Sequence, residues 1–340
     1  MPRKQLTYKE AGVDIDAGEE SVRRIRNLVA TTFTPGVLQG IGHFGAMFEL
    51  ALTEIREPVL ISSVDGVGTK LKIAVMMNKH DTIGEDLVNH CVNDIFTTGA
   101  QPLFFLDYLS LGKVDPAVVE QLVTGMARGC KKANCALIGG ETAEMTDLYQ
   151  PGDYDIAGTI VGVVEKSHLI NGESIQEGDQ LIGLASSGLH TNGYTLARKI
   201  FFDICHFTVD QFHLQLQTTI GDALLQVHRN YFPVVAPLLH KCDIHGMAHI
   251  TGGGIVSNTN RIVPAGLQID VDWSAWEWPP IFRLLQKLGN VPDDDMKRTF
   301  NLGIGFVLVV SSEVVAELQA ELLAAGEQSF LIGKVVRIKK

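Results

Sequence analysis

Residues 59–70 read Val59-Leu60-Ile61-Ser62-Ser63-Val64-Asp65-Gly66-Val67-Gly68-Thr69-Lys70, an apolar strand that ends at a carboxylate and a glycine-containing turn. Glycine lets the backbone approach a ligand closely and takes a positive φ without steric cost. Backbone N–H groups and Lys70 suit a phosphate, whereas Asp65 can hold a hard cation. The Walker A spacing is absent. Taken alone, the stretch favours a ligand site no more than a tight turn capped by Lys70.

The overall composition narrows the possible partners. A length of 340 residues corresponds to about two domains, and an apolar content of 46% with 20% charged residues is typical of globular proteins. The net charge of −11 disfavours binding to nucleic acid or to an anionic membrane. A phosphate group must therefore be held by local features such as glycine loops and single basic side chains.

Cysteine usage and hydropathy indicate a cytoplasmic protein that does not enter a membrane. The five cysteines are an odd number without a C-x-x-C pair, which favours free thiols in a reducing compartment. The N-terminal residues show no apolar signal region, and no run of about 18 apolar residues occurs.

Strand and helix patterns alternate along the chain and predict an α/β (α+β) fold. Between 165 and 179 a polar stretch contains two turn signals, so we expect an N-terminal domain at 1–168 and a C-terminal α/β domain at 174–340. The predicted strands are 59–64, 103–109, 136–138, 156–164, 180–186, 302–310 and 329–337. The predicted helices are 82–98, 116–133, 193–203, 222–231, 279–288 and 312–324.

Residue types at the helix ends support two of these helices. Thr82 and Glu85 have the spacing of a capping box for helix 82–98, and Gly99 follows as its stop. Asp115 and Pro116 suit the N-cap and first position of helix 116–133.

Asp94 is the most unusual residue of helix 82–98. The helical period places it on or beside the apolar face, near the helix C-terminus, where the macrodipole disfavours an anion. Such a carboxylate needs compensation, either from a nearby lysine or N–H group or from a Mg²⁺ ion shared with Asp65. Two carboxylates about 4 Å apart repel by roughly 4 kcal/mol at an effective dielectric of 20, unless a cation or proton lies between them.

Three further loops carry residues suited to ligand binding. Gly139, Gly140 and Glu141 follow the buried strand 136–138, where close backbone approach and a carboxylate suit a nucleotide or cation, although Glu141 could be a solvated acid. His190 lies among small polar residues with little core to fill, which favours substrate contact or acid–base work. The loop 249–254, HITGGG, suits a phosphate or an interdomain hinge.

These segments, in this order, closely resemble the phosphoribosylformylglycinamidine cyclo-ligase family, also called aminoimidazole ribonucleotide synthetases. The resemblance covers essentially the whole chain, and its most specific stretches are DGVGTK at 65–70 and GGETAEM at 139–145. Other matching stretches are YKEAGVDIDAG at 8–18, HDTIGEDLV at 80–88, CVNDI at 91–95, QPLFFLDYLSLGK at 101–113, YDIAG at 154–158, SSGLHTNGY at 186–194, HITGGG at 249–254 and RTFNLGIG at 298–305.

The resemblance implies an ATP-dependent enzyme of purine biosynthesis. Members phosphorylate the formamide oxygen of formylglycinamidine ribonucleotide, after which an amidine nitrogen closes the imidazole ring and phosphate leaves. It further implies a requirement for Mg²⁺, assistance by K⁺, and a homodimer joined through the N-terminal domains. The alternative hypothesis is that the protein is a related, non-catalytic ATP-binding maturation factor or scaffold.

Carried onto this sequence, the family pattern implies a set of site residues. Asp65 and Asp94 become metal ligands and, with Lys70 and His190, the catalytic residues. The implied nucleotide contacts are Gly66, Gly68, Thr69, Lys70, Gly139, Gly140 and Glu141. The implied substrate contacts are His190, Asn192, Thr251, Gly252 and Gly253.

The sequence departs from the family pattern at a few positions. His43 stands where a glycine is usual. Ser63-Val64 replaces a usual Gly-Thr, which we expect to remove a hydroxyl beside the metal. Val227-His228 interrupts a usual Pro-Thr. These changes affect fine substrate contacts more than the reaction.

Overall fold

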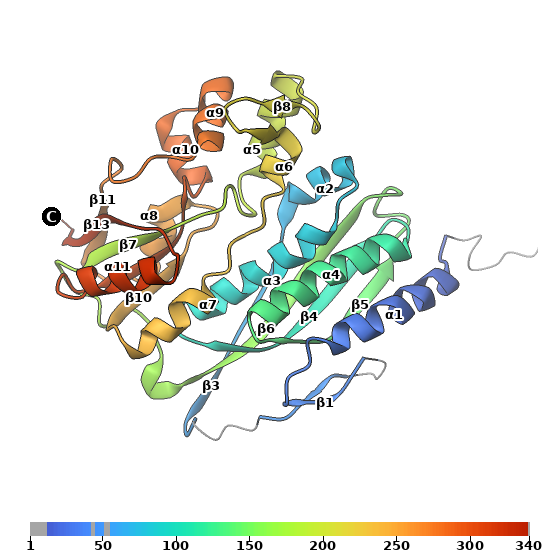
Figure 1. Ribbon diagram of the computed structural model, residues 1–340, viewed down its shortest axis with the longest axis horizontal. Coiled ribbons are helices and arrows are strands. Elements are labelled where there is room, and N and C mark those ends of the chain that lie inside the picture. Colours follow the sequence, from blue (N-terminus) through green and yellow to red (C-terminus); the bar gives the residue numbers. More distant parts are fainter. Residues whose placement is uncertain (1–11, 42–44, 51–54, 339–340) are drawn as a thin grey trace, which may run out of the picture.

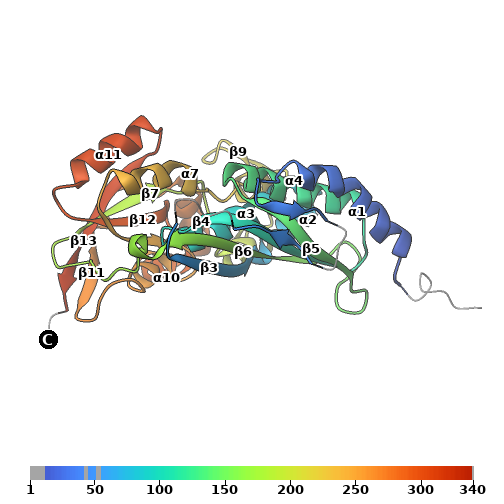
Figure 2. The same ribbon diagram turned by 90° about the horizontal axis from the view of Figure 1, so that it is seen from below.

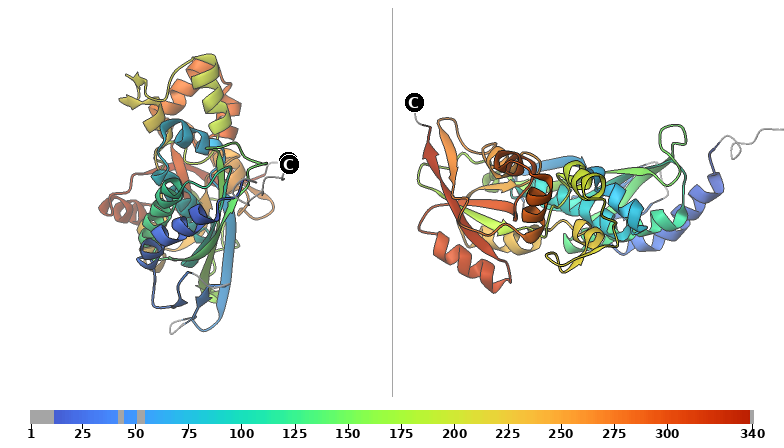
Figure 3. Two further views of the ribbon diagram at one scale, coloured as in Figure 1. Left: turned by 90° about the vertical axis from the view of Figure 1, so that its right-hand side faces the viewer. Right: turned by 90° about the horizontal axis from the view of Figure 1, so that it is seen from above.

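The computed structural model describes residues 12–41, 45–50 and 55–338, which form two large sheets in successive halves of the chain and two small hairpins. His43 and the start of the segment 8–18 lie outside the described residues. The halves lie side by side along the long axis of the molecule (Figures 1 and 3).

The first half contains a four-stranded mixed sheet with the order β3-β6-β4-β5. Strand β6 runs antiparallel to both neighbours, whereas β4 and β5 are parallel. The elements of this half are α1 (Ile15–Ala30), β1 (Val37–Gln39), β2 (Met47–Phe48), β3 (Pro58–Gly66), α2 (Leu71–Met77), α3 (Asp81–Phe96), β4 (Gln101–Leu111), α4 (Pro116–Lys132), β5 (Ala136–Glu144) and β6 (Tyr154–Glu165).

The second half contains a five-stranded antiparallel sheet with the order β10-β12-β7-β13-β11 and a small hairpin, β8-β9. Its elements are β7 (Gln180–Ala185), α5 (Tyr194–Arg198), β8 (Phe212–His213), β9 (Thr218–Thr219), α6 (Ile220–Leu224), α7 (Phe232–Val235), β10 (Ile244–His249), α8 (Gly254–Thr259), β11 (Leu267–Val271), α9 (Pro280–Gly289), α10 (Asp293–Thr299), β12 (Ile304–Val310), α11 (Val315–Ala324) and β13 (Ser329–Arg337).

All predicted strands exist, but three local expectations were wrong. The expected capping box at Thr82 does not form: Thr82 Oγ1 has no hydrogen-bond partner, and Glu85 binds Arg128 and Lys132 instead. Strand β5 continues to Glu144, so the glycine pair lies inside a strand rather than in a loop after it. The predicted helix 222–231 ends at Leu224, and residues 226–231 are irregular.

Helices α1, α3 and α4 cover one face of the first sheet, and within the described residues the opposite face is largely open (Figure 2). On that open face the side chains of Leu60, Val64 and Tyr108 are 56%, 66% and 41% exposed. Among the described residues, the β1–β2 hairpin covers only the β4–β5 end, where the Phe48 ring lies 5.3 Å from that of Phe104.

Helix α3 is the centre of the molecule because it packs on the first sheet, on α4 and on the second half. It carries polar side chains although nearly all of its residues are buried. Three of them hold the irregular segment 226–231 of the second half. The amides of Asn89 and Asn93 donate to the carbonyls of His228 and Arg229 at 2.7 Å. Asp86 accepts from the His228 backbone N–H at 2.6 Å.

Glycines allow α3 and α4 to pack with their backbones in contact. A Cβ at Gly84 would overlap the carbonyl oxygen of Leu122, and one at Gly125 would overlap the carbonyl oxygen of Asp81. The two helices are therefore fixed relative to each other by the lack of side chains at these positions.

We expect Gly84→Ala to destabilise the fold by about 1–3 kcal/mol or more, because overpacking outweighs the gain of up to ~1 kcal/mol in helix propensity. Gly18→Ala on α1 is the matched control, since nothing lies within 4 Å of a Cβ there. Urea unfolding measures both. A Gly84→Ala protein as stable as Gly18→Ala would contradict the close packing.

Candidate functional site

The predicted pair Asp65 and Asp94 lies together at the junction of β3 and α3. His90 Nε2 is 2.8 Å from Asp65 Oδ2 and 3.8 Å from Asp94 Oδ2. His90 and Asp94 are one helical turn apart on α3, so their side chains share a face. The compensation expected for Asp94 is therefore present in the chain, and it comes from imidazoles rather than from lysine.

The departure at Ser63 does not remove a hydroxyl from this site. Ser63 Oγ donates to Asp94 Oδ2 at 3.1 Å. Successive side chains of a strand point to opposite faces, so Ser63 faces Asp94 whereas Val64 lies on the open face of the sheet. The effect of replacing the usual Gly-Thr on a bound metal stays a prediction.

Three histidines lie around the pair, and sequence reasoning did not assign a role to any of them: His90, His228 and His249. His249 Nδ1 lies 2.8 Å from Asp94 Oδ1, and its Nε2 lies 2.9 Å from His228 Nε2. Thr191 Oγ1 joins His90 Nδ1 at 2.8 Å to His228 Nδ1 at 3.3 Å. The i,i+4 spacing of His90 and Asp94 was the available signal; His228 had none, because an irregular segment carries it.

The surrounding charges shift the pKa values within this cluster. Burial raises the pKa of Asp65 and Asp94, but hydrogen bonds from His90 and His249 outweigh it, so both values lie below their usual range. Burial lowers the pKa of His90, and the two carboxylates outweigh that effect and raise it. For His249 burial dominates and the pKa is lowered.

His190 is 1% exposed, so the expectation that it has little core to fill was wrong. It adopts φ +59° and stacks on His228 with ring centroids 4.1 Å apart. Its Nε2 accepts from the Ser187 backbone N–H at 3.2 Å, and its Nδ1 has no partner. Burial holds its pKa well below the usual range, so the ring is neutral.

Lys70 is fully buried rather than directed at an open pocket. Its ammonium lies 2.8 Å and 2.9 Å from the two oxygens of Asp86 and donates to the carbonyl of Gln226 at 2.6 Å. Burial raises the pKa of Asp86 to about 6, against the opposing effect of Lys70. The position favours a role in holding α3 against segment 226–231 over the predicted phosphate contact.

The predicted substrate loops approach one another at the junction of the halves. A Cβ at Gly252 would lie 3.3 Å from Asn192 Oδ1. Thr251 lines a pocket of about 350 Å³ together with Ser63, Asp94 and His249. Asn192 lines a second pocket of about 570 Å³. Gly68 and Thr69 line that second pocket too, whereas Gly66 lies at the end of β3 and Gly253 caps α8.

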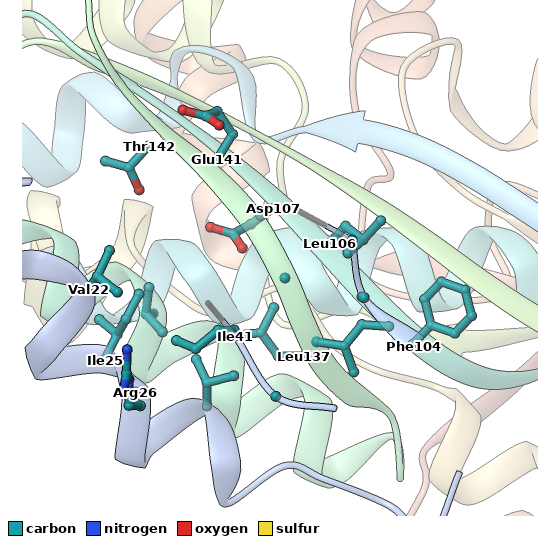
Figure 4. A pocket seen from close by; sticks show the side chains of 18 of the residues that line it. Val22, Ile25, Arg26, Ile41, Phe104, Leu106, Asp107, Leu137, Glu141 and Thr142 are labelled. Atoms are coloured by element: carbon teal, nitrogen blue, oxygen red, sulfur yellow. The ribbon is translucent and has the colours of Figure 1, made fainter. Parts of the chain in front are cut away.

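Gly139, Gly140 and Glu141 line a separate and larger pocket of about 1260 Å³ between α1 and the edge strand β5 (Figure 4). A Cβ at Gly140 would overlap the carboxylate of Asp107, so the glycine makes room for that side chain. Burial raises the pKa of Asp107 to about 7. Arg26 on α1 also lines this pocket, across from the strands (Figure 4).

The sheet register fixes the separation of these two regions. Asp65 pairs with Gly158, Gly158 with Asp107, and Asp107 with Gly140. Three strand spacings of about 4.8 Å place Asp65 and Gly140 roughly 14 Å apart. The predicted nucleotide contacts are thus spread over two pockets.

Family models match both halves of the chain. The family described as AIR synthase related protein, N-terminal domain, matches residues 48–164, and the corresponding C-terminal domain family matches residues 176–340. These two matches confirm a two-domain fold; the exact limits 1–168 and 174–340 stay a prediction.

Curated relatives match over almost the full length. A phosphoribosylformylglycinamidine cyclo-ligase from Desulfitobacterium hafniense (strain DSM 10664 / DCB-2) is 53% identical over 332 residues, which cover 97% of this chain and 96% of the relative. One with the same name from Alkaliphilus metalliredigens (strain QYMF) is 49% identical over 343 residues, covering 100% and 98%.

Solved structures share the fold at low identity. A thiamine-monophosphate kinase from Stenotrophomonas maltophilia K279a has a TM-score of 0.71 at 16% identity and covers 94% of each chain. A hydrogenase maturation protein HypE in complex with ATP has a TM-score of 0.63 at 17% identity, covering 94% of this chain and 87% of that chain.

The position of Lys70 predicts a stability effect. Lys70→Met leaves Asp86 buried without its partner, which should cost about 3–5 kcal/mol in the free energy of unfolding. Urea unfolding of Lys70→Met, Asp86→Asn and the double variant measures the coupling, and the double variant should lose less than the sum of the two.

ATP binding to Lys70→Met serves as the second measurement. If Lys70→Met is as stable as the wild-type protein but binds ATP more weakly, the result supports the phosphate contact that the sequence predicted for Lys70.

Proposed function

The chain belongs to the phosphoribosylformylglycinamidine cyclo-ligase family, so it is an ATP-dependent enzyme of purine biosynthesis, and we propose how its residues divide the work. The observation that carries the proposal is the meeting of Asp65 and Asp94 with the loops of Asn192 and Thr251 at the junction of the two halves. Formylglycinamidine ribonucleotide and ATP are its substrates.

The chemistry requires positioning and charge neutralisation. The formamide oxygen is a poor leaving group until ATP phosphorylates it, after which an amidine nitrogen attacks the carbon and phosphate departs. Orienting the two reactants can account for roughly 7–11 kcal/mol of the barrier. No covalent nucleophile on the protein is needed for this sequence of steps.

A divalent cation fits the carboxylate pair. Asp65 and Asp94 approach the same nitrogen, His90 Nε2, from β3 and α3, and such oxygen donors suit Mg²⁺. When bound, the ion neutralises charge on the transferred phosphoryl group. Asp65 is half-exposed and Asp94 faces a pocket, so both carboxylates can reach a ligand. A K⁺ ion is proposed on the family resemblance alone.

The pockets suggest a division between the two substrates. Gly139, Gly140 and Glu141 bind the nucleotide in the larger pocket, where Arg26 adds positive charge. Gly66, Gly68 and Thr69 contact its phosphates from the end of β3. Asn192 and the 251–253 loop bind the ribonucleotide. His190 is buried, stacks on His228 and accepts from the Ser187 backbone N–H, so it positions the chain segment that carries Asn192.

The open face of the first sheet supports a homodimer. Monomeric proteins rarely leave a contiguous apolar sheet face uncovered, and Leu60 and Val64 lie on this face. We place the second copy there.

A cytoplasmic location accompanies this function. All five cysteines are unpaired in the structure, and four of them are buried, as expected in a reducing compartment. Among the described residues, none of the helices combines the length and apolarity needed to span a bilayer.

Phosphate release with purified protein, ATP, Mg²⁺, K⁺ and formylglycinamidine ribonucleotide tests the assignment. Release should depend strictly on the ribonucleotide. Asp94→Asn should lower the rate by about 100-fold or more while the melting temperature changes by a few degrees at most. ATP binding without ribonucleotide-dependent release would favour the scaffold alternative, and a collapsed fold would make Asp94 structural.

Sedimentation velocity tests the dimer. Leu60→Lys places a charge on the proposed interface and should shift the protein toward monomer. Leu323→Lys on α11, an equally apolar and 74% exposed position in the other half, should leave the dimer intact. A monomeric wild-type protein at micromolar concentration contradicts the proposed interface.

A further inference from the structure

The carboxylate pair of the cation site is faced by two imidazole nitrogens. His90 Nε2 points at Asp65 and Asp94, and His249 Nδ1 points at Asp94. We propose that His90 and His249 are ligands of the same divalent ion as the two carboxylates, so that the site prefers a transition metal such as Mn²⁺ or Co²⁺ to Mg²⁺. This inference rests on the proposed function in one respect only, namely that a cation binds at Asp65 and Asp94.

The geometry selects these two histidines from the four in the cluster. His190, His228 and His249 also bring their nitrogens within 4.8 Å of one another. However, the His190 and His228 rings are stacked at an interplanar angle of 23°. One ion cannot lie in both ring planes of a stacked pair at bonding distance. The His90 and His249 rings instead meet edge to face at 75°, an arrangement that lets both nitrogens converge.

Three of the four donor atoms are close enough for one ion. The ligand atoms of His90, Asp94 and His249 all lie within 4.8 Å of one another. An ion with bonds of about 2.0–2.2 Å separates its ligands by roughly 3–4 Å, so movements of about 1 Å or less bring these three donors onto one ion. Asp65 lies next to this group through its 2.8 Å contact with His90 Nε2 and completes the shell as the fourth ligand.

Each of the four donors is already oriented by a partner behind it. Ligating imidazoles usually bind a fixed group through their other nitrogen. His90 Nδ1 is held by Thr191 Oγ1, and His249 Nε2 is held by His228.

The carboxylates are supported in the same way. Asp94 accepts from Ser63 Oγ, and Asp65 Oδ1 accepts from the Gly66 backbone N–H at 2.7 Å. Such partners behind each ligand are typical of metal sites.

The mixed donor set decides which metals bind well. Mg²⁺ prefers an octahedral shell of oxygens and keeps several waters, whereas imidazole suits transition metals. Two nitrogens and two carboxylate oxygens therefore favour Mn²⁺, Co²⁺ or Zn²⁺ over Mg²⁺.

Co²⁺ binding to the nucleotide-free protein provides the test, because nitrogen and oxygen ligands give visible absorption bands that report the coordination directly. We expect one Co²⁺ per chain, displaced by Mg²⁺ only at about 100-fold or greater excess. His249→Gln keeps a similar volume but replaces nitrogen with an amide oxygen, so it should lower the Co²⁺ preference by about tenfold or more. His90→Gln should act in the same direction.

His245→Gln is the matched control, because His245 lies on the same strand β10 but pairs with Asp179. It should keep the wild-type spectrum and preference. His228→Asn retains all four ligands and removes the support of His249, so Co²⁺ affinity should fall by about 10–100-fold with a changed spectrum. Thermal melting confirms that each variant is folded.

The proposal would be overturned by equal binding of Co²⁺ and Mg²⁺ to the wild-type protein or by an unchanged preference in folded His249→Gln. Absence of Co²⁺ binding would overturn it as well. Because ATP and ribonucleotide are omitted, failure of ring closure in the phosphate-release assay leaves this measurement unaffected. A failed metal preference likewise leaves ribonucleotide-dependent phosphate release intact.

Discussion

The polar contact between helix α3 and segment 226–231 is the constraint on which the site depends. Asp86, Asn89 and Asn93 recur at spacings of three and four, so they form one stripe along α3. They bind backbone groups of a segment that has no regular structure of its own. Because buried backbone groups must be paired, this stripe determines where the segment lies and places His228 against His249.

The same contact explains why α3 does not have the usual amphipathic pattern of one buried apolar face and one exposed polar face. Its apolar face packs on the first sheet and α4, and its polar stripe packs on the second half, so both faces are buried. Lys70 extends the stripe by joining Asp86 to the carbonyl of Gln226. Since an unpaired buried charge is costly, this pair ties the glycine turn after β3 to the same junction.

These contacts show which features of the fold and the site could be predicted from the sequence and which could not. Strands were predictable because apolar runs such as 59–64 are bounded by turn residues, and Asp94 was informative because it broke a helical rule. The burial of Lys70 was not predictable, since its partners Asp86 and Gln226 are 16 and 156 residues away. The extension of β5 through Gly139 and Gly140 was missed because glycine usually ends a strand, whereas here Gly140 makes room for Asp107.

The histidine cluster shows why residues distant in sequence decide the chemistry of the site. Asp65 and Asp94 alone offer only oxygen, and from them the sequence suggested a hard cation. The fold adds His90 from the same helix turn as Asp94 and His249 from the end of β10, each with its outer nitrogen already bound. A carboxylate pair that is faced by two oriented imidazoles has a different metal preference from the pair by itself. The identity of the ion is therefore a property of the packed junction, where both halves of the chain supply its donors.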